Sequence, residues 1–151
     1  MKRFTSMIFL TGFAVSAFAA EAPAAETPLA KTINDADLQW GACPPFMPEG
    51  CQIAVLHGDP AMPSADVFFK IPPGYAMPEH WHTSAEHIVL ISGEMTVTFK
   101  DHPPVTLKPG MYAYGPPKML HKGVCGNGDA CVVFISFEGP VDAFPTDTPA
   151  P

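Results

Sequence analysis

Apolar residues in the middle of the chain come in short runs that proline and glycine clusters separate. The runs are rich in β-branched and aromatic residues, and turn signals arrive about every eight to twelve residues. No stretch keeps a helical period, and the 19 prolines disfavour long helices. The pattern therefore predicts an all-β domain, a small sandwich or barrel. Its strands are expected within residues 51–58, 65–74, 86–93, 94–101, 104–110, 111–117 and 131–139.

Alternation within residues 94–101 indicates how one of these strands is oriented. Met95, Val97 and Phe99 fall on one face, and polar residues fall on the other. That strand is therefore expected to have a core face and a wet face. Residues 87–92 and 131–137 are nearly apolar throughout, which predicts central strands that are covered on both faces.

The two ends of the chain differ from this middle part. Residues 1–20 begin with Lys2 and Arg3, continue with an apolar run and close on small residues, which is typical of a secretory signal peptide. The run is shorter than the ~20 apolar residues of a spanning helix, so no membrane span is expected after cleavage. We expect a flexible leader over 21–38, one barrel domain over 39–140 and a flexible tail over 141–151.

Charge narrows the classes of partner. The chain has a net charge of −7, and the expected cleavage removes two of its 8 basic residues and none of its 15 acidic ones, which leaves −9. Nucleic acid is therefore excluded as an expected partner. Arg3 is the only arginine, so the mature chain has no guanidinium with which to hold a carboxylate or phosphate. An anionic ligand would depend on a metal, a lysine or backbone amides.

The four cysteines suit an oxidising compartment, and we expect a periplasmic or secreted protein. Proximity in the sequence favours Cys43 with Cys51 and Cys125 with Cys131 among the possible pairings. The second pair flanks a turn signal at 126–130, so it is expected to join the two arms of a hairpin. A zinc site is the alternative, but neither pair has the two-residue spacing typical of one.

Residues 78–87, PEHWHTSAEH, contain three of the chain's 6 histidines and two glutamates. His80 and His82 are two residues apart, so on a strand they share one face with Cα atoms ~6.6 Å apart, and both can bind one ion. On a helix the same spacing would place them on roughly opposite sides. Pro72, Pro73 and Pro78 disfavour that helix.

Glu86 can join this site only if the chain turns. In an unbroken strand its Cα would lie ~13 Å from that of His82, whereas ligand bonds are ~2.0–2.2 Å long. We therefore expect a turn at 83–85 that returns Glu86 on the neighbouring strand, beside the histidines. Glu79 and His87 should point away by alternation.

His121 is the best remaining nitrogen ligand, because it follows a strand that ends in a wide Gly-Pro-Pro bend. That bend could return a distant side chain to the first cluster. His57 and His102 lie beside turn signals and are expected to face solvent.

These residues resemble the cupin superfamily, and the compact spacing is similar to that of small single-domain bacterial cupins. The first cupin motif is matched by Gly74, His80, His82, Glu86 and Gly93, and the second by Gly110, Pro116 and His121. The resemblance covers residues 50–138. It implies a jelly-roll β-barrel that holds one divalent metal through His80, His82, Glu86 and His121. A polar surface cluster and a cupin that has lost its metal are the alternatives.

Two positions depart from the second motif. Lys118 stands where a glycine is usual, and Cys125 stands where an asparagine is usual. That asparagine is not a ligand in the family, so metal binding is expected to survive, and Cys125 suits the expected disulfide. Lys118 could reach an anionic substrate at the barrel mouth or be an ordinary exposed lysine.

The identity of the metal decides what the site can do. The ligand set does not choose among Mn, Fe, Ni and Zn. An octahedral ion would keep two positions open for water, oxygen or a chelating substrate, whereas tetrahedral zinc would be nearly saturated. The leading hypothesis is a metal-dependent small-molecule enzyme, dioxygenase-like or a related oxidoreductase or lyase, with metal-bound water as the only catalytic group beyond the ligands.

The alternative is a non-catalytic periplasmic module that uses a metal to bind or sense a small-molecule ligand. Metal storage is weaker, because one mononuclear site per chain gives little capacity. A neutral, partly apolar ligand would suit a pocket lined by Phe68, Met77, Met95, Met119 and Phe134, although core packing explains each of these equally well. The resemblance also implies a homodimer, in which an outward Trp81 or Leu120 could form part of an apolar patch.

Overall fold

The structure is a computed structural model that describes residues 27–149. The chain divides into two units, residues 1–30 and 31–151, and all of the strands that the structure describes lie in the second. The expected signal peptide and residues 21–26 of the expected leader lie outside the described range. Within that range, residues 27–39 contain no strand. A search of the described residues found no helix with the length and apolar character to span a membrane.

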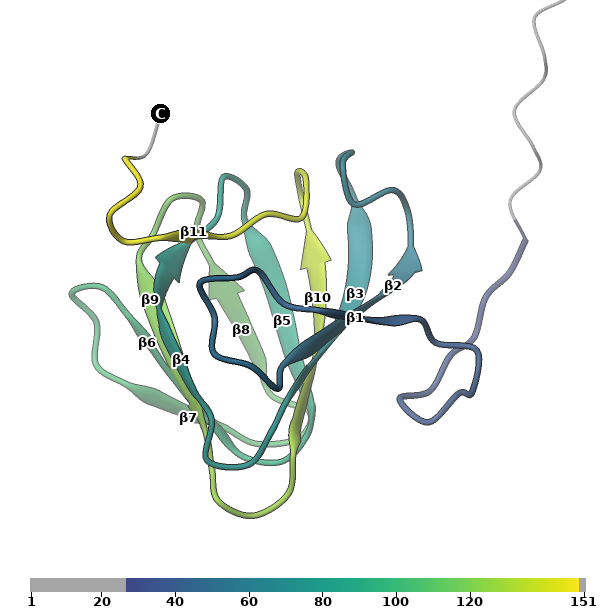
Figure 1. Cartoon of the computed structure of the whole chain (residues 1–151), viewed down its shortest axis with the longest axis horizontal. Coiled ribbons are helices and arrows are strands. Elements are labelled where there is room, and N and C mark those ends of the chain that lie inside the picture. The colour runs from purple at the N-terminus through teal and green to yellow at the C-terminus, as the bar shows by residue number, and fades with distance from the viewer. Residues whose placement is uncertain (1–26, 150–151) are drawn as a thin grey trace, which may run out of the picture. The chain divides into compact units, whose positions relative to one another are not determined.

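The second unit consists of two antiparallel sheets that face each other (Figure 1). The strands of the larger sheet are, in spatial order, β1 (Trp40–Ala42), β2 (Gln52–His57), β3 (Ala65–Ile71), β10 (Cys131–Phe137), β5 (Glu86–Ser92) and β8 (Tyr112–Gly115). The smaller sheet contains β11 (Phe144–Pro145), β4 (Ala76–Trp81), β9 (His121–Cys125), β6 (Met95–Phe99) and β7 (Val105–Leu107). The expected all-β jelly roll is confirmed.

The core lies between the two sheets and follows the alternation of their strands. Met95 and Val97 of β6 are buried, whereas Thr96 between them is not, as the pattern predicts. β10 lies between β3 and β5 and is buried along almost its whole length, as expected of a central strand. β5 differs from the expectation, because Ile88 and Leu90 are buried but Ile91 is exposed. Its outer face is therefore partly open.

Both expected cysteine pairs form disulfides, Cys43 with Cys51 and Cys125 with Cys131. The second pair does not join the arms of a hairpin, which corrects the expectation. β9 pairs with β4 and β6, whereas β10 pairs with β3 and β5. The turn at 126–130 therefore carries the chain from one sheet to the other, at the bottom of Figure 1. This disulfide joins the two sheets at that end.

Residues 141–149 are not a flexible tail but pack against the smaller sheet, which corrects a second expectation. Phe144 pairs with Trp81 across β11 and β4, and the two rings stack with their centroids 4.7 Å apart. The indole nitrogen of Trp81 donates a hydrogen bond to the carbonyl of Thr148, at 3.2 Å. Trp81 is therefore buried rather than exposed in a patch, because this segment covers its large apolar ring.

Candidate metal centre

Three histidines meet between the two sheets, at the edge where β4 ends and β9 begins. His80 is directly opposite His121 across these strands, and His82 follows β4. All three are buried, with exposed fractions of 3%, 5% and 7% for His80, His121 and His82. One ring nitrogen from each lies within 4.8 Å of the others. The structure therefore brings the three expected histidine ligands together.

A register shift in β4 places His80 in this position. Met77 pairs with Gly123, so an unbroken register would put Glu79 opposite His121, but the pairing shifts between Met77 and His80. Pro78 lies in the shifted stretch, and proline has no amide hydrogen to donate to the ladder. The shift lets Met77 and His80, three residues apart, both point inward. Strict alternation would have sent one of them outward.

Each histidine ring is oriented by a hydrogen bond to a backbone carbonyl. Nδ1 of His80 donates to Pro78 at 2.8 Å, Nδ1 of His121 donates to Met119 at 3.0 Å, and Nδ1 of His82 donates to Asp142. A carbonyl oxygen only accepts, so each Nδ1 carries the hydrogen and each Nε2 keeps its lone pair. This is the tautomer that a metal ligand requires, held by the partners that metal-bound histidines commonly have.

Burial keeps two of these rings neutral. Burial, with a smaller contribution from the neighbouring His82, lowers the pKa of His80 to about 4. Burial also lowers the pKa of His121 to about 3, with smaller contributions from His80 and His82. Neutral imidazole is the form that binds a metal, so these rings need no deprotonation at neutral pH.

Glu86 reaches the cluster from the opposite sheet, not from the neighbouring strand that the sequence predicts. The expected turn at 83–85 crosses from the smaller sheet to the larger one, where Glu86 begins β5. Its Oε1 lies 3.1 Å from Nε2 of His121, and its Oε2 lies 3.5 Å from Nε2 of His82. The side chain is 2% exposed.

The Glu86 carboxylate is placed tightly and left without a hydrogen bond. A Cβ at Gly115, its partner on β8, would lie 2.7 Å from Cγ and Oε1 of Glu86, so only glycine leaves room there. Oε1 is buried and accepts no hydrogen bond in the described structure. Burial raises the pKa of Glu86, and the neighbouring His82 partly opposes that rise. An unpartnered buried oxygen costs on the order of 1–3 kcal/mol or more if charged.

These observations fit a cation. Nε2 of His121 and Oε1 of Glu86 lie 3.1 Å apart, and a cation beside both would bind the lone pairs of both atoms at once. Imidazole nitrogens with a carboxylate suit a divalent transition metal. The three histidines form a group that could hold such an ion, and Glu86 as a fourth ligand stays a prediction.

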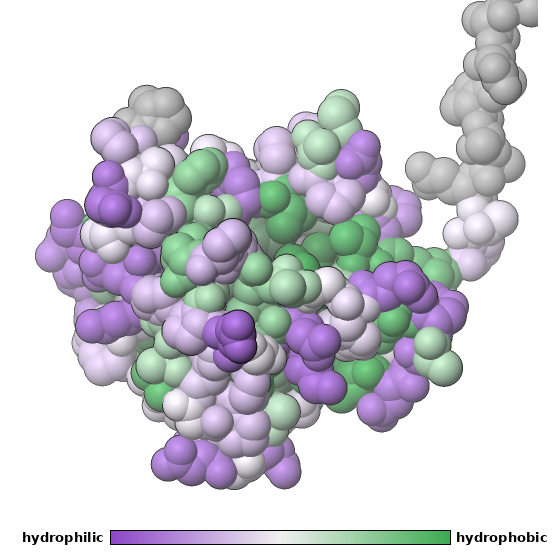
Figure 2. Space-filling view, viewed as in Figure 1, coloured by the Kyte–Doolittle hydropathy of each residue, from purple (hydrophilic) through white to green (hydrophobic). Residues whose placement is uncertain are grey.

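A cavity of about 460 Å³ opens beside the cluster. Its walls are mainly apolar side chains from the inner faces of both sheets, including Met77, Met95, Ile88, Val133, Ile135 and Phe137. Green, hydrophobic residues surround a hollow near the top of the face drawn in Figure 2. The charged and ionisable residues of the wall are the candidate ligands, together with Lys122 and Asp142.

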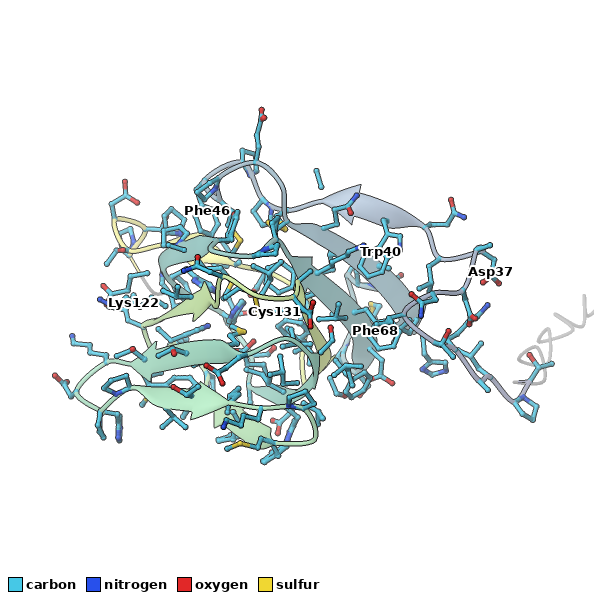
Figure 3. All side chains as sticks on the ribbon, turned by 90° about the horizontal axis from the view of Figure 1, so that it is seen from below. Asp37, Trp40, Phe46, Phe68, Lys122 and Cys131 are labelled. Atoms are coloured by element: carbon cyan, nitrogen blue, oxygen red, sulfur yellow. A yellow bond between two sulfur atoms is a disulfide. The ribbon has the colours of Figure 1, made fainter. Side chains whose placement is uncertain are left out.

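Only two of the five expected pocket residues line this cavity. Met77 and Met95 do so. Phe68 and Phe134 face each other on the opposite face of the larger sheet, with ring centroids 6.5 Å apart (Figure 3 labels Phe68). They were misplaced because β3 and β10 are apolar on both faces, so alternation does not tell which face is inside. Met119 contributes a carbonyl to the orientation of His121 and is not part of the cavity wall.

A loop over residues 43–51 closes part of the cavity and was not foreseen. The Cys43–Cys51 disulfide ties its ends together, and the hydroxyl of Tyr75 donates to the carbonyl of Pro48 at 2.5 Å. Met47 lines the cavity, and the ring centroids of Phe46 and His80 are 6.1 Å apart. Figure 3 labels Phe46 on this loop. The two cysteines around a proline-rich stretch were the signal that could have found this loop.

Asp142 is a further residue that the sequence did not reveal. It lies in the expected tail, yet its carbonyl accepts from His82, and its carboxylate accepts from the amide of Thr83 at 2.9 Å and from the Thr83 hydroxyl. Nothing in its local sequence signals this role, because its partners lie about sixty positions away.

The residues expected outside the site are outside it. Glu79, His57 and His102 are exposed. The ring of His87 lies on the outer face of the larger sheet, where it hydrogen bonds with Tyr112 at 2.7 Å and contacts Glu138 at 3.0 Å.

Lys118 has a φ of +62°, the backbone conformation in which glycine is most at ease. Its amide donates to the carbonyl of His82 at 2.8 Å. This explains why glycine is usual at the position.

Comparisons with known proteins found a relative in sequence and solved structures with a similar fold. An uncharacterized protein of Methanocaldococcus jannaschii is 37% identical over 67 residues, which are 43% of this chain and 56% of that protein. The match therefore spans a little over half of the length of that relative. The solved DMSP lyase DddQ from Ruegeria pomeroyi has a TM-score of 0.63 at 19% identity, with 76% of this chain and 64% of that chain covered.

The polyketide cyclase RemF from Streptomyces resistomycificus has a TM-score of 0.62 at 20% identity, with 80% of this chain and 88% of that chain covered. At these identities the likeness shows the fold alone. A family model, the ChrR cupin-like domain, matches residues 30–142, which include all four candidate ligands and both cupin motifs. This chain therefore belongs to the ChrR cupin-like domain family of the cupin superfamily.

Proposed function

We propose that this protein binds one divalent transition metal through His80, His82, Glu86 and His121 and uses it to transform a small molecule. The observation that carries the proposal is the convergence of three buried imidazole nitrogens with Oε1 of Glu86, which has no hydrogen-bond partner and lies 3.1 Å from Nε2 of His121, beside an apolar cavity. Once bound, a divalent ion supplies Lewis acidity toward the oxygen atoms of a small molecule.

The side chains of the protein prepare the site for such a reaction. Hydrogen bonds from Nδ1 hold all three imidazoles in the ligand tautomer before any ion arrives. The apolar walls exclude water, which strengthens every electrostatic interaction inside. Met47 and Phe46, on the loop that the disulfide closes, add a wall near His80. The expected gain is a fixed geometry for the reacting molecule.

The reaction that we favour is a dioxygenase-like oxidation or a related lyase reaction. Solved structures with this fold include a lyase and a cyclase, which supports an enzyme of small molecules without naming the reaction. A ligand set that leaves adjacent positions open on an octahedral ion would also admit dioxygen together with a substrate.

A metal-dependent ligand-binding or sensing module is the second candidate. One observation favours it: the described cavity wall offers no uncommitted general acid or base. Apart from the candidate ligands, its charged residues are Asp142, whose carboxylate is bonded to Thr83, and Lys122, which β9 turns outward. A protein that only binds its ligand would need no general acid or base.

Elemental analysis of the protein purified from its native compartment tests the proposal, followed by assays of oxygen consumption and of substrate cleavage with that metal. We expect close to one ion per chain and turnover of a small apolar oxygen-containing compound. A stoichiometric metal with no turnover across a broad panel would favour the binding module. Absence of any bound transition metal, with no uptake on reconstitution, would contradict both candidates.

We further propose that the protein works in the periplasm or as a secreted protein, as a homodimer. Two disulfides support an oxidising compartment. Exposed Ile91, Tyr112 and Tyr114 on the outer face of the larger sheet support a second copy of the chain as a partner. Cell fractionation with thiol labelling tests the first part, and light scattering of the purified protein tests the second.

A further inference from the structure

We propose that the cavity takes an uncharged molecule with one chelating end and an apolar body about the size of an aromatic ring. The inference rests on the proposed metal centre, and it names the class of ligand that this centre would act on. Four features of the cavity support the inference: the residues of its wall, its volume, the packing of two methionines on one side and the charges of its lining residues.

The wall separates two chemistries. The candidate ligand atoms, one ring nitrogen from each of three histidines and the carboxylate of Glu86, lie together in one part of the wall. The remaining inner surface comes from aliphatic, aromatic and thioether side chains of both sheets, among them Met95, Val133 and Phe137. A ligand that satisfies both parts has donor atoms at one end and hydrocarbon at the other.

The volume sets the size of the body. An apolar cavity of about 150 Å³ is enough to hold benzene. The cavity here measures about 460 Å³, so it has room for a chelating head and a ring-sized body together. A ligand as small as a two-carbon acid would leave most of the apolar wall facing water or empty space, which forfeits contact energy.

Two methionines form an adaptable floor, and a glycine makes room for them. A Cβ at Gly123 would lie 2.4 Å from the methyl carbon of Met77 and 2.8 Å from that of Met95. Both methyl groups therefore occupy the space that a side chain at this position would fill. Methionine is flexible and polarizable and packs well against aromatic rings, so this floor suits a planar apolar body.

The charges disfavour an anionic ligand. Among the described residues of the cavity wall, Lys122 is the only one with a cationic side chain at neutral pH, and it lies at an outward position of β9. The carboxylates of Glu86 and Asp142 contribute negative charge to the same wall. An added anionic group on the ligand would lie in apolar surroundings with no cation to pair with it. The body is therefore neutral.

The loop over residues 43–51 encloses this body. Met47 is buried, and the loop is tied at Cys43–Cys51 and by the hydrogen bond from Tyr75 to Pro48. Enclosure on this side increases the apolar area that a ring-sized body buries on binding.

Two hydroxamates that share one chelating head test the inference. Benzohydroxamate has a phenyl body, and acetohydroxamate has a methyl group in its place. The probe experiment uses full-length protein loaded with Co²⁺, with binding followed by calorimetry and by the visible absorption of the cobalt ion. We expect benzohydroxamate to bind at least about 10-fold more tightly, because a phenyl group buries more apolar area than a methyl group. Oxalate, which is small and dianionic, is expected to bind more weakly than either.

Gly123→Ala tests whether the methionine floor recognises the body. The added methyl group pushes the ends of Met77 and Met95 into the cavity, since both are flexible and can move. We expect the affinity for benzohydroxamate to fall about 5-fold while that for acetohydroxamate stays unchanged. Gly128→Ala is the matched control, because a Cβ there meets nothing within 4 Å.

The outcomes separate this inference from the proposed function. Equal affinities for the two hydroxamates, or tighter binding of oxalate, would overturn the ligand class while the metal centre stands. Failure of the protein to bind Co²⁺ would overturn the metal centre. In that case toluene is titrated into the metal-free protein while the methyl resonances of Met77 and Met95 are followed, and no shift of these resonances would overturn the apolar site as well.

Discussion

The backbone carbonyl of Asp142 accepts a hydrogen bond from Nδ1 of His82, across 60 positions of the sequence. The side chain of Asp142 also accepts hydrogen bonds from the amide and the hydroxyl of Thr83. Asp142 therefore holds His82 and Thr83 in place through three hydrogen bonds. The C-terminal segment therefore orients a candidate metal ligand and does more than cover the barrel.

Asp142→Ala tests this relationship. The substitution removes both acceptors for Thr83 and frees the carbonyl that orients His82, so we expect metal affinity to fall by about 10-fold or more. The measurement is competition with a chromophoric chelator. Asp147→Ala is the control, because Asp147 is an exposed aspartate of the same segment. Equal affinity in the two variants would show that Asp142 does not orient the ligand.

The metal content of alanine variants tests the ligand assignment. We expect His82→Ala and His121→Ala to lower the metal content several-fold, because each removes a buried nitrogen from a shared point. His57→Ala should retain full content, since His57 is exposed and outside the cluster. Elemental analysis of equally folded samples measures the content. The same content in all three variants would be inconsistent with the site described above.

Removal of the metal should destabilise the fold. A ligand present at 100 times its dissociation constant adds about 2.7 kcal/mol to the free energy of unfolding. For a domain of this size we expect chelation to lower Tm by roughly 10 °C. Glu86→Gln should show a smaller difference between its metal-loaded and metal-free forms, because it lacks the anionic ligand. Scanning calorimetry with and without chelator provides the measurement, and an unchanged Tm in the wild type would argue against a bound ion.

Acid should destabilise the metal-free protein through two histidines. Burial lowers the pKa of His80 to about 4 and that of His121 to about 3, from an ordinary value of 6.5. As the pH falls below 6.5, the unfolded chain binds protons at these positions before the folded protein does. The free energy of unfolding therefore decreases as the pH falls from 6.5 to about 3.

Glu86 acts in the opposite direction, because burial raises its pKa and its ionised form is disfavoured in the fold. Urea titrations of chelator-treated protein between pH 7 and 4 measure how steeply the free energy of unfolding changes with pH. His80→Gln should make this dependence less steep, whereas His102→Gln, at an exposed position, should not. The same dependence in the wild type and both variants would mean that His80 does not control the acid response.

The Cys125–Cys131 disulfide should stabilise the joint between the two sheets. It closes a loop with a sequence separation of 6, and the loss of loop-closure entropy predicts about 2 kcal/mol. The double variant Cys125→Ala with Cys131→Ala is therefore expected to unfold at a lower urea concentration, with an unchanged dependence of the free energy of unfolding on urea.

The double variant Cys43→Ala with Cys51→Ala should instead weaken the binding of benzohydroxamate, because that pair ties the loop over the cavity.

Several features followed from the sequence by itself. The grouping of His80, His82, Glu86 and His121 came from their spacing and residue types together with the resemblance to the cupin motifs, and the structure brings these side chains close together. The positions of β2, β3, β5, β6, β7, β8 and β10 and the pairing of the cysteines also followed, whereas β4 and β9, which carry the histidines, were not among the expected strands. The strands, the cysteine pairs and the grouping of His80, His82 and Glu86 depend on short-range patterns, in which residues close in sequence limit one another.

The tertiary structure alone decided how those strands are partnered. Alternation predicts that residues two apart share a face, but not which face is inside when both are apolar, and this is why Phe134 was assigned to the cavity. Glu86 reaches the histidines from the opposite sheet, and Asp142 reaches His82 from the C-terminal segment. These are contacts between distant parts of the chain, and their free energy exists only once both sheets have closed around one core.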